Sequence, residues 1–318
     1  MNKTAKIITA CAACVAAAGL CGYVISLNRE SNVPTVSEVK VTEPVTEEVK
    51  LLSDNWDEEF EYVPSQEGIS GRAQLYLRKN KDVAGWIRIN KTILDNPVVL
   101  DPGDIPADSG YGPEGYDSNS YYLDHDLEGA PFRAGTLFMD YRNVFGSSEE
   151  EQSDNIVIYG HNMANNTMFG SIRRYRQDDY KFYDESPFIE LSSNYKDYQY
   201  IIFGFLITSG SWQSDFCYWN MEDFGSEEEF NGYVEKVRAG AMIDTGVDVK
   251  YGDKLLTLST CYANEDNSRF IVVARRLRDG ETAGDINSIE RTPEYIQKQK
   301  EEEEKEKASG STEASTES

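Results

Sequence analysis

A cysteine and an arginine, eight residues apart, stand where one strand-like run ends and the next begins. Cys261 ends the apolar, β-branched run 254–261, and Arg269 begins the next such run, 269–276. The residues between them include Asn, Asp and Ser, which are common in loops. His161 ends a third run of the same kind. If the runs are neighbouring strands, a nucleophile, an acid/base and a cation meet at their ends.

Acyl transfer through a cysteine needs these three residue types. The thiolate is the nucleophilic form of cysteine, and a neighbouring imidazole can take the thiol proton and later protonate a leaving amine. A guanidinium stays protonated, so it cannot act as the base, but it can donate hydrogen bonds to the oxyanion of a tetrahedral intermediate. In a strand, Cys261 shares a face with Ser259, and Arg269 shares a face with Ile271. The pattern therefore favours a cysteine-dependent acyl-transfer site.

Several sequence motifs resemble those of the sortases, the cysteine transpeptidases of Gram-positive cell surfaces. Thr-Leu-Ser-Thr-Cys at 257–261 with its downstream arginine, and Ile-Val-Ile-Tyr-Gly-His-Asn-Met at 156–163, resemble motifs of that family. Segments that resemble class B sortases, in the same order along the chain, lie at 82–87, 96–99, 121–126 and 135–140. The resemblance covers about residues 70–277. The combination is far more specific than any one motif and resembles a class B sortase.

The resemblance implies a role for each of the three residues. Cys261 is expected to be the nucleophile, His161 the general acid/base, and Arg269 the residue that stabilises the oxyanion and the substrate. Ser259 and Thr260, next to the nucleophile, are expected to contribute to the substrate groove. No metal and no organic cofactor is implied.

The chain departs from the class B pattern at one position. Some class B members carry an acidic residue two positions after the cysteine, where this chain has Ala263. Glu265 and Asp266 are close in sequence, but neither is assigned a catalytic role. Whether an acidic residue assists His161 is therefore left open.

The resemblance implies a mainly β fold, a closed eight-stranded barrel with an N-terminal helix and a helix inserted between late strands. The chain itself has many short strand-like runs, which are typical of a sandwich or a barrel. They lie at 85–89, 94–100, 135–140, 155–161, 187–192, 198–209, 254–261 and 269–276. Residues 70–80 suit the N-terminal helix. Ser226 and Glu229 form a capping box that predicts the start of the inserted helix.

Composition divides the chain into four parts. Residues 1–27 are predicted to be a cytoplasmic N-terminus and a transmembrane signal-anchor, and 28–68 an acidic, disordered spacer. The catalytic domain is expected at 69–280, and an acidic, low-complexity C-terminal tail at 281–318. The net charge of −25 argues against binding to nucleic acid, which needs a basic surface.

An almost uncharged run from 7 to 27 predicts where the protein resides. The run is long enough to cross a bilayer as a helix, and the positive charge before it favours a cytoplasmic N-terminus. The expected localisation is therefore the cell membrane, with a single span and an extracellular catalytic domain. A cleaved signal peptide is the competing interpretation.

Cysteine usage leaves one alternative for the predicted nucleophile. Cys217 and Cys261 are the cysteines outside the apolar N-terminal run, and an exported protein could join them in a disulfide. The strand-end position of Cys261 and the arginine eight residues later favour a free nucleophile instead. Cys217 is then interpreted as a packed bystander.

The expected function is transpeptidation, by resemblance to the family. The enzyme would cleave a C-terminal sorting motif of surface proteins after its threonine and hold the acyl group as a thioacyl-enzyme. It would then transfer the group to an amine of a peptidoglycan precursor (lipid II) or of a pilin. The expected partners are sorting-signal-bearing surface proteins, that amine, and the membrane through the N-terminal anchor. A pilus-polymerising sortase, a cysteine peptidase and a catalytically inactive surface scaffold stay as alternatives, and the sorting pentapeptide is left open.

Overall fold

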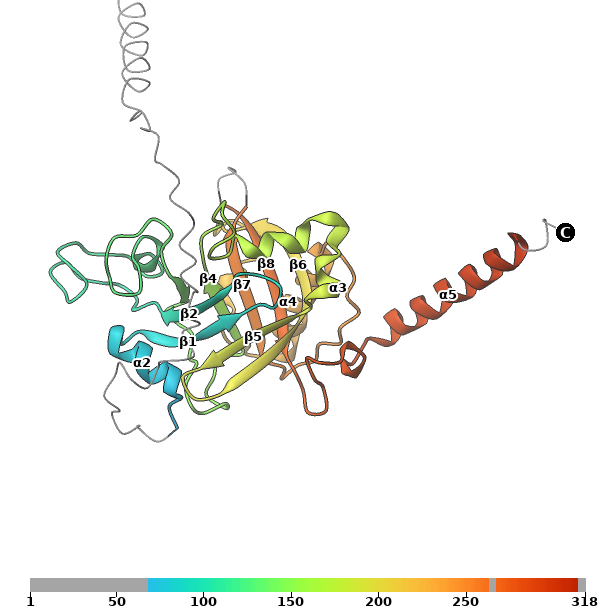
Figure 1. Ribbon diagram of the computed structural model, residues 1–318, viewed down its shortest axis with the longest axis horizontal. Coiled ribbons are helices and arrows are strands. Elements are labelled where there is room, and N and C mark those ends of the chain that lie inside the picture. Colours follow the sequence, from blue (N-terminus) through green and yellow to red (C-terminus); the bar gives the residue numbers. More distant parts are fainter. Residues whose placement is uncertain (1–67, 263–266, 314–318) are drawn as a thin grey trace, which may run out of the picture. The chain divides into compact units, whose positions relative to one another are not determined.

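The computed structural model describes residues 68–262 and 267–313 of the 318-residue chain, and it contains a closed β-barrel (Figure 1). Within these residues, eight strands follow one another around the barrel in the order β1-β2-β3-β4-β7-β8-β6-β5. Their bounds are β1 (Val83–Arg88), β2 (Asp95–Leu100), β3 (Leu137–Met139), β4 (Asn155–Tyr159), β5 (Phe188–Ser193), β6 (Asp197–Ser209), β7 (Leu255–Cys261) and β8 (Ser268–Arg276). Each strand overlaps a run predicted from the sequence, and the predicted fold class is confirmed.

Helices and 3₁₀ turns occupy the connections between the strands. Helix α2 (Gly71–Lys79) precedes β1, and the hydroxyl of Ser70 accepts a hydrogen bond from a backbone N–H of its first turn at 3.2 Å. Helix α4 (Glu227–Gly240) lies between β6 and β7 in sequence, and Ser226 caps it in the same way at 3.2 Å. Both predicted helices are therefore confirmed. The other helical segments of the described chain are η1 (Tyr121–Leu123), η2 (Ser171–Arg176), η3 (Asp178–Tyr180), α3 (Phe182–Glu185), η4 (Tyr218–Asn220), η5 (Ile286–Ser288) and α5 (Pro293–Glu313).

Two pairs of neighbouring strands run parallel. β2 pairs with β3 and β4 pairs with β7 in parallel, whereas the other neighbours around the barrel are antiparallel. A parallel pair cannot be joined by a tight turn, because the chain must return to the end at which the first strand began. Between β4 and β7 the chain therefore forms β5, β6 and α4 before it comes back.

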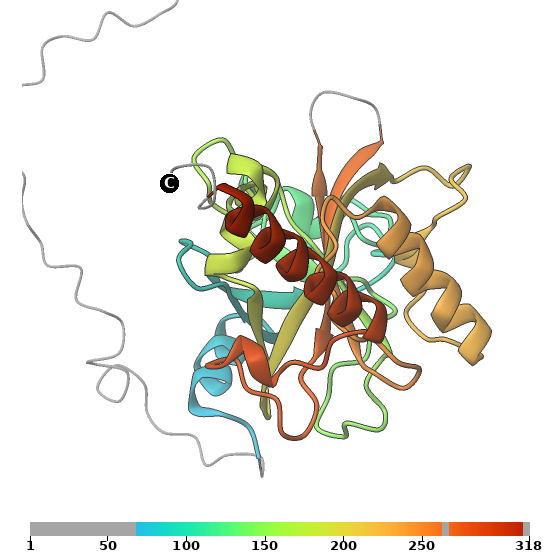
Figure 2. The same ribbon diagram turned by 90° about the vertical axis from the view of Figure 1, so that its right-hand side faces the viewer.

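Side-chain alternation divides the apolar residues between two cores. Ile158 of β4 and Leu258 of β7 belong to the cluster inside the barrel, where both are fully buried. Val157, of opposite parity, belongs to a second cluster to which α4 contributes. Figure 2 shows α4 lying along the outside of the barrel. A Cβ on Gly204 of β6 would lie 2.7 Å from the Val237 side chain of α4, so the close contact requires glycine.

The chain stays in contact with the barrel after β8. Arg275 is fully buried and donates to both carboxylate oxygens of Glu281, each at 2.6 Å. Burial alone would raise the pKa of Glu281, but hydrogen bonds from Arg275 and from two backbone N–H groups outweigh it and lower this pKa to about 2. Ile289 is also buried, in the cluster that contains α4. The domain boundary at residue 280 stays a prediction, although the structure packs the segment that follows it on the barrel.

The predicted membrane anchor and extracellular localisation need a correction. Residues 7–27, the expected span, lie outside the described part of the chain, as does almost all of the predicted spacer 28–68. Across residues 68–262 and 267–313, none of the helices combines the length and the apolar character that a bilayer crossing requires. The localisation as a single-pass membrane protein with an extracellular catalytic domain is therefore not supported.

Replacing Glu281 with Gln should destabilise the fold in a pH-dependent way. At pH 7 the variant leaves the buried Arg275 without its anionic partner, which should lower the free energy of unfolding by about 3 kcal/mol. A carboxylate with a lowered pKa stabilises the fold above the pKa of the unfolded chain, and this stability is lost as the pH falls. The deficit of the variant should therefore shrink as the pH falls from about 4.5 toward about 2. Urea unfolding at pH 7 and pH 3 measures it.

The matched control for this prediction is Glu294→Gln, which removes the charge of an exposed glutamate in the first turn of α5. It should change the free energy of unfolding by less than about 0.5 kcal/mol at either pH. An equal deficit for Glu281→Gln at both pH values would contradict the stabilising ion pair.

Candidate active site

Cys261 and Arg269 lie directly opposite each other on the hairpin formed by β7 and β8. Opposed residues in an antiparallel pair have their side chains on the same face and close together. Cys261 is exposed and its thiol is free, whereas Arg269 is half-buried. The structure therefore brings the predicted nucleophile and the predicted cation together on neighbouring strands.

The parallel pairing of β4 with β7 carries His161 to the same place. The last registered pair is Tyr159 with Ser259, and the backbone N–H of the next residue still donates to the Ser259 carbonyl at 3.2 Å. Continuing this register places His161 beside Cys261. The Asn162 side chain donates to the Cys261 carbonyl at 2.9 Å and ties the histidine segment to the nucleophile strand. Cys261 and Arg269 thus lie on β7 and β8, and His161 follows the end of β4; Figure 1 shows these three neighbouring strands side by side.

The ring of His161 is held by a backbone carbonyl. Its Nε2 lies 2.7 Å from the carbonyl oxygen of Leu123, in the connection between β2 and β3. A carbonyl can only accept, so Nε2 carries a proton and donates it. In the neutral ring the free lone pair is then on Nδ1, the nitrogen that can accept a thiol proton. Leu123 was not predicted from the sequence, because any residue can supply a carbonyl.

Within the described residues, Arg269 donates one side-chain hydrogen bond. Its side chain lies against Gly210 after β6, where an added Cβ would be 3.2 Å from the arginine. Nη1 donates to the Ser268 carbonyl at 3.1 Å. Among the residues that the structure describes, no carboxylate is close enough to Arg269 to form an ion pair. The remaining N–H groups can therefore serve an anionic oxygen of a substrate.

The two predicted groove residues, Ser259 and Thr260, lie next to the nucleophile but are buried. Each is 2% exposed, and each hydroxyl already has a hydrogen-bond partner. The Thr260 hydroxyl donates to the carbonyl of Gly160 at 2.7 Å, so it links β7 to the strand that leads to the histidine. Ser259 lies on the same face as Cys261, two positions earlier. Their part in substrate binding stays a prediction.

Tyr218 is a second residue near the site that was not predicted from the sequence. It lies in η4, is 1% exposed, and its hydroxyl is 2.6 Å from the hydroxyl of Ser259. Burial raises the pKa of Tyr218 to about 12, although the hydrogen bond with Ser259 and the charge of Arg269 oppose the rise. The phenol therefore stays protonated at neutral pH and supports the strand that ends in Cys261. The aromatic run around it predicts burial but does not reveal this partner.

The alternative of a disulfide between Cys217 and Cys261 is not found in the structure. Cys217 and Cys261 are both free in the described chain. Cys217 is half-buried, and its sulfur lies 3.4 Å from the carbonyl of Ser214, to which the thiol donates. The thiol of Cys217 is thus held inside its own loop, and that of Cys261 is exposed.

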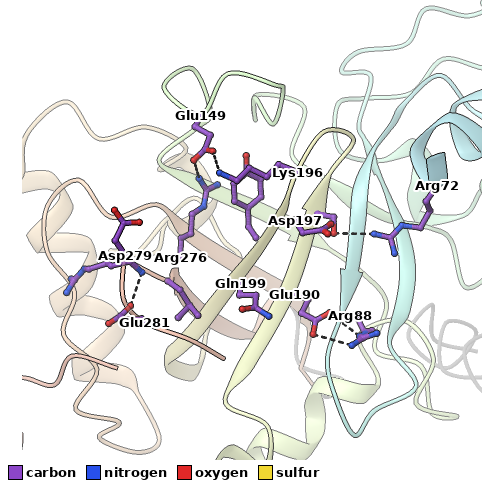
Figure 3. A pocket seen from close by; sticks show the side chains of 14 residues that line it. Arg72, Arg88, Glu149, Glu190, Lys196, Asp197, Gln199, Arg276, Asp279 and Glu281 are labelled. Atoms are coloured by element: carbon purple, nitrogen blue, oxygen red, sulfur yellow. Dashed lines mark hydrogen bonds and ion pairs between the residues drawn. The ribbon is translucent and has the colours of Figure 1, made fainter. Parts of the chain in front are cut away.

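The pocket drawn in Figure 3 belongs to another part of the surface. Its lining contains none of the three predicted catalytic residues. Several of its charges neutralise one another, since Arg88 pairs with Glu190 at 3.1 Å and Glu149 pairs with both Lys196 and Arg276. This pocket is therefore a surface of ion pairs rather than a second reactive centre.

Comparison with known proteins shows which family this chain is similar to. The Sortase domain model of protein families matches residues 127–277. Sortase B of Listeria monocytogenes serovar 1/2a is 32% identical over 187 residues, which are 59% of this chain and 65% of that relative. A solved Bacillus anthracis protein similar to sortase B is 28% identical, with a TM-score of 0.54 over 68% of this chain and 87% of that one. The solved complex of Staphylococcus aureus sortase B with substrate is 27% identical, with a TM-score of 0.54 over 67% and 88%.

Residues 127–277 therefore match the Sortase domain, and the chain is similar to proteins named sortase B. The closed barrel agrees with this similarity, because the similar solved structures are also named sortase B or described as similar to it. The match spans just under two thirds of the Listeria relative.

The hydrogen bond between Tyr218 and Ser259 can be tested with a double-mutant cycle. Tyr218→Phe and Ser259→Ala should each lower the free energy of unfolding by about 1–2 kcal/mol. Each substitution removes one of the two hydroxyls and leaves the other buried without this hydrogen-bond partner. The double variant should lose less than the sum, with a coupling of about 1 kcal/mol. Tyr218→Phe combined with Thr260→Val is the control, since these hydroxyls have different partners, and it should be additive. Additive losses for Tyr218 and Ser259 would rule out the bond.

Proposed function

We propose that this chain is a cysteine transpeptidase that acts on the C-terminal sorting motif of surface proteins. One observation carries the proposal: an exposed, free cysteine lies directly opposite an arginine, and the parallel register of the neighbouring strand, continued by two residues, leads a histidine to the same place. The similarity to proteins named sortase B supports the same reaction, because sortases are cysteine transpeptidases. The Staphylococcus aureus relative has been solved with its substrate, which supports a substrate-binding role for this barrel.

The first half of the proposed reaction forms a thioacyl-enzyme. His161 Nδ1 takes the thiol proton of Cys261, and the resulting thiolate attacks the carbonyl carbon of the threonine in the sorting motif, so that the carbonyl oxygen becomes an oxyanion. The guanidinium of Arg269 donates hydrogen bonds to that oxyanion. The C–N bond then breaks, and protonated His161 gives its proton to the leaving amine. An S–C bond has replaced the C–N bond, and the imidazole is left neutral.

The second half transfers the acyl group to an amine. An incoming amine attacks the thioacyl carbon and gives a proton to His161, while Cys261 leaves as the thiolate. The acceptor that we propose is an amine of a peptidoglycan precursor, as the class B resemblance implies. An amine of a pilin would define a pilus-polymerising enzyme, and water would define a peptidase.

A catalytically inactive surface scaffold is the alternative outside enzymes. Such a scaffold needs neither an exposed thiol nor a cation with uncommitted donors. In the described chain Cys261 is exposed and Arg269 has no ion-pair partner. A catalytic role explains why an exposed thiol and an arginine without an ion-pair partner lie together at one hairpin.

Mass spectrometry of the full chain tests the proposal. Incubation with sorting peptides of the Leu-Pro-x-Thr-Gly and Asn-Pro-x-Thr types should give a thioacyl adduct on Cys261, which an added amine then removes. Cys261→Ala should give no adduct. Arg269→Ala should slow adduct formation by about 100- to 1000-fold, the usual effect of losing an oxyanion donor. Arg88→Ala, which removes an arginine paired with Glu190 across β1 and β5, is the matched control and should keep the wild-type rate.

The outcomes separate the alternatives. Adduct loss to water alone, with every amine tested, would favour the peptidase. If no peptide forms an adduct while iodoacetamide still labels Cys261, the transpeptidase proposal fails and the scaffold replaces it.

A further inference from the structure

The long connection between β2 and β3 returns to the barrel at Asn119, which has a left-handed backbone with φ of 61°. Its backbone N–H and both polar atoms of its side chain form hydrogen bonds with residues that follow β2 and β3. Its backbone N–H donates to Asp101 Oδ1 at 2.9 Å, at the end of β2. Its side-chain Nδ2 donates to Asp140 Oδ2 at 2.9 Å, and its Oδ1 accepts from the N–H of Tyr141 at 3.1 Å. Asn119 therefore links the connection to the segments that follow both β2 and β3.

One route leads from Asn119 to His161 through the connection itself. The 3₁₀ turn η1 begins two residues after Asn119, and it ends at Leu123, whose carbonyl accepts from the histidine Nε2. Tyr122 of the same turn is 1% exposed, and its hydroxyl donates to Asp82 at 2.8 Å. The turn is therefore held by Asn119, which lies two residues before it, and by its own central tyrosine, which is buried.

A second route leads to His161 through the strand that carries it. Asp140 Oδ2, which accepts from Asn119, also accepts from the hydroxyl of Tyr159 at 2.9 Å. Tyr159 lies in β4, two residues before the histidine, and burial raises its pKa well above the usual value, so its hydroxyl remains a donor. Arg142 Nε donates to Asp140 at 2.8 Å and compensates its charge. The same carboxylate thus holds the strand end and Asn119.

One carboxylate of this network is only partly paired. Asp101 is 1% exposed, its Oδ2 has no hydrogen-bond partner, and burial raises its pKa to about 6 despite the two backbone N–H groups that donate to Oδ1. An unpaired oxygen on a buried carboxylate is energetically unfavourable. The other oxygen of Asp101 nevertheless binds the backbone of Asn119 and fixes the start of this segment.

We propose that Asn119 is a positioning residue for His161. Its side chain joins Asp140 and Tyr159 on the strand side to the turn whose Leu123 carbonyl orients the ring. By holding that carbonyl in place it keeps the proton on Nε2 and the free lone pair on Nδ1. The catalytic consequence rests on the proposed function, whereas the effect on the ring does not.

The effect on the ring can be measured by ¹⁵N NMR of the full chain. The chain has two histidines, and His161→Ala assigns their ring signals. Asn119→Gly is the informative variant, because glycine tolerates the left-handed backbone while the side-chain bonds are lost. In the wild type the His161 signals should be those of the Nε2-protonated tautomer. In Asn119→Gly the two ring nitrogen shifts should move toward each other, as both tautomers become populated.

Kinetics test the catalytic consequence. Asn119→Gly should lower kcat for thioacyl formation by about 10- to 100-fold with little change in KM, because a displaced acid/base affects the chemical step more than binding. Added to His161→Ala, the same substitution should cause no further loss, since it acts through the histidine. Asp108→Gly is the matched control, at an exposed position of the same connection with φ of 57°, and it should match the wild type.

The results distinguish the two levels of inference. Unchanged His161 ring shifts in Asn119→Gly, or a full additional loss in the double variant, would overturn the positioning role even if the enzyme is a transpeptidase. A changed tautomer in a chain that forms no thioacyl adduct would keep the positioning role and reject the proposed function. If Asn119→Gly does not fold, Tyr159→Phe removes the strand-side bond instead and should shift the same ring signals.

Discussion

The parallel pairing of β4 with β7 is the constraint on which the proposed site depends. Its register pairs Tyr159 with Ser259. When this register is continued by two residues, His161 lies beside Cys261. Side chains alternate along a strand, so a slip of one residue would send one of the two to the opposite face. The antiparallel pairing of β7 with β8 then sets Arg269 opposite the nucleophile. Two adjacent pairings thus assemble the three side chains, of which His161 is far from the other two in the sequence.

The two cores of the barrel explain why this register is strongly preferred. Ile158 and Leu258 are fully buried inside the barrel, whereas Thr257 is fully buried on the other face of β7. The Thr257 hydroxyl donates to Asn155 at 2.9 Å and bonds the hydroxyl of Tyr233 at 2.7 Å. A one-residue slip would place apolar side chains on this polar cluster and an unpaired hydroxyl in the barrel, and both changes are costly. The packing that stabilises the fold therefore also fixes the geometry of the site.

Local patterns are enough to predict the strands and the opposition of Cys261 and Arg269, because a hairpin joins residues that are close in sequence. The place of His161 is predicted through its strand-end motif, but the parallel pairing that brings it to the cysteine joins runs about 100 residues apart and has no local signature. Tyr218 reaches Ser259 only through the tertiary packing of a 3₁₀ turn. Leu123 contributes its backbone carbonyl, and because every residue has one, the residue type does not predict this contact. The sequence thus predicts the reactive groups, and the fold is needed to see what holds them.

The most direct test of the proposed chemistry is a crystal structure of the full chain trapped as a covalent adduct between Cys261 and a sorting-peptide analogue. The adduct oxygen that corresponds to the scissile carbonyl should lie within hydrogen-bond distance of the Arg269 guanidinium. The amine side of the analogue should point toward His161, whose Nε2 should still donate to the Leu123 carbonyl. An adduct oxygen directed away from Arg269, or an analogue whose amine side lies away from His161, would contradict the proposed roles.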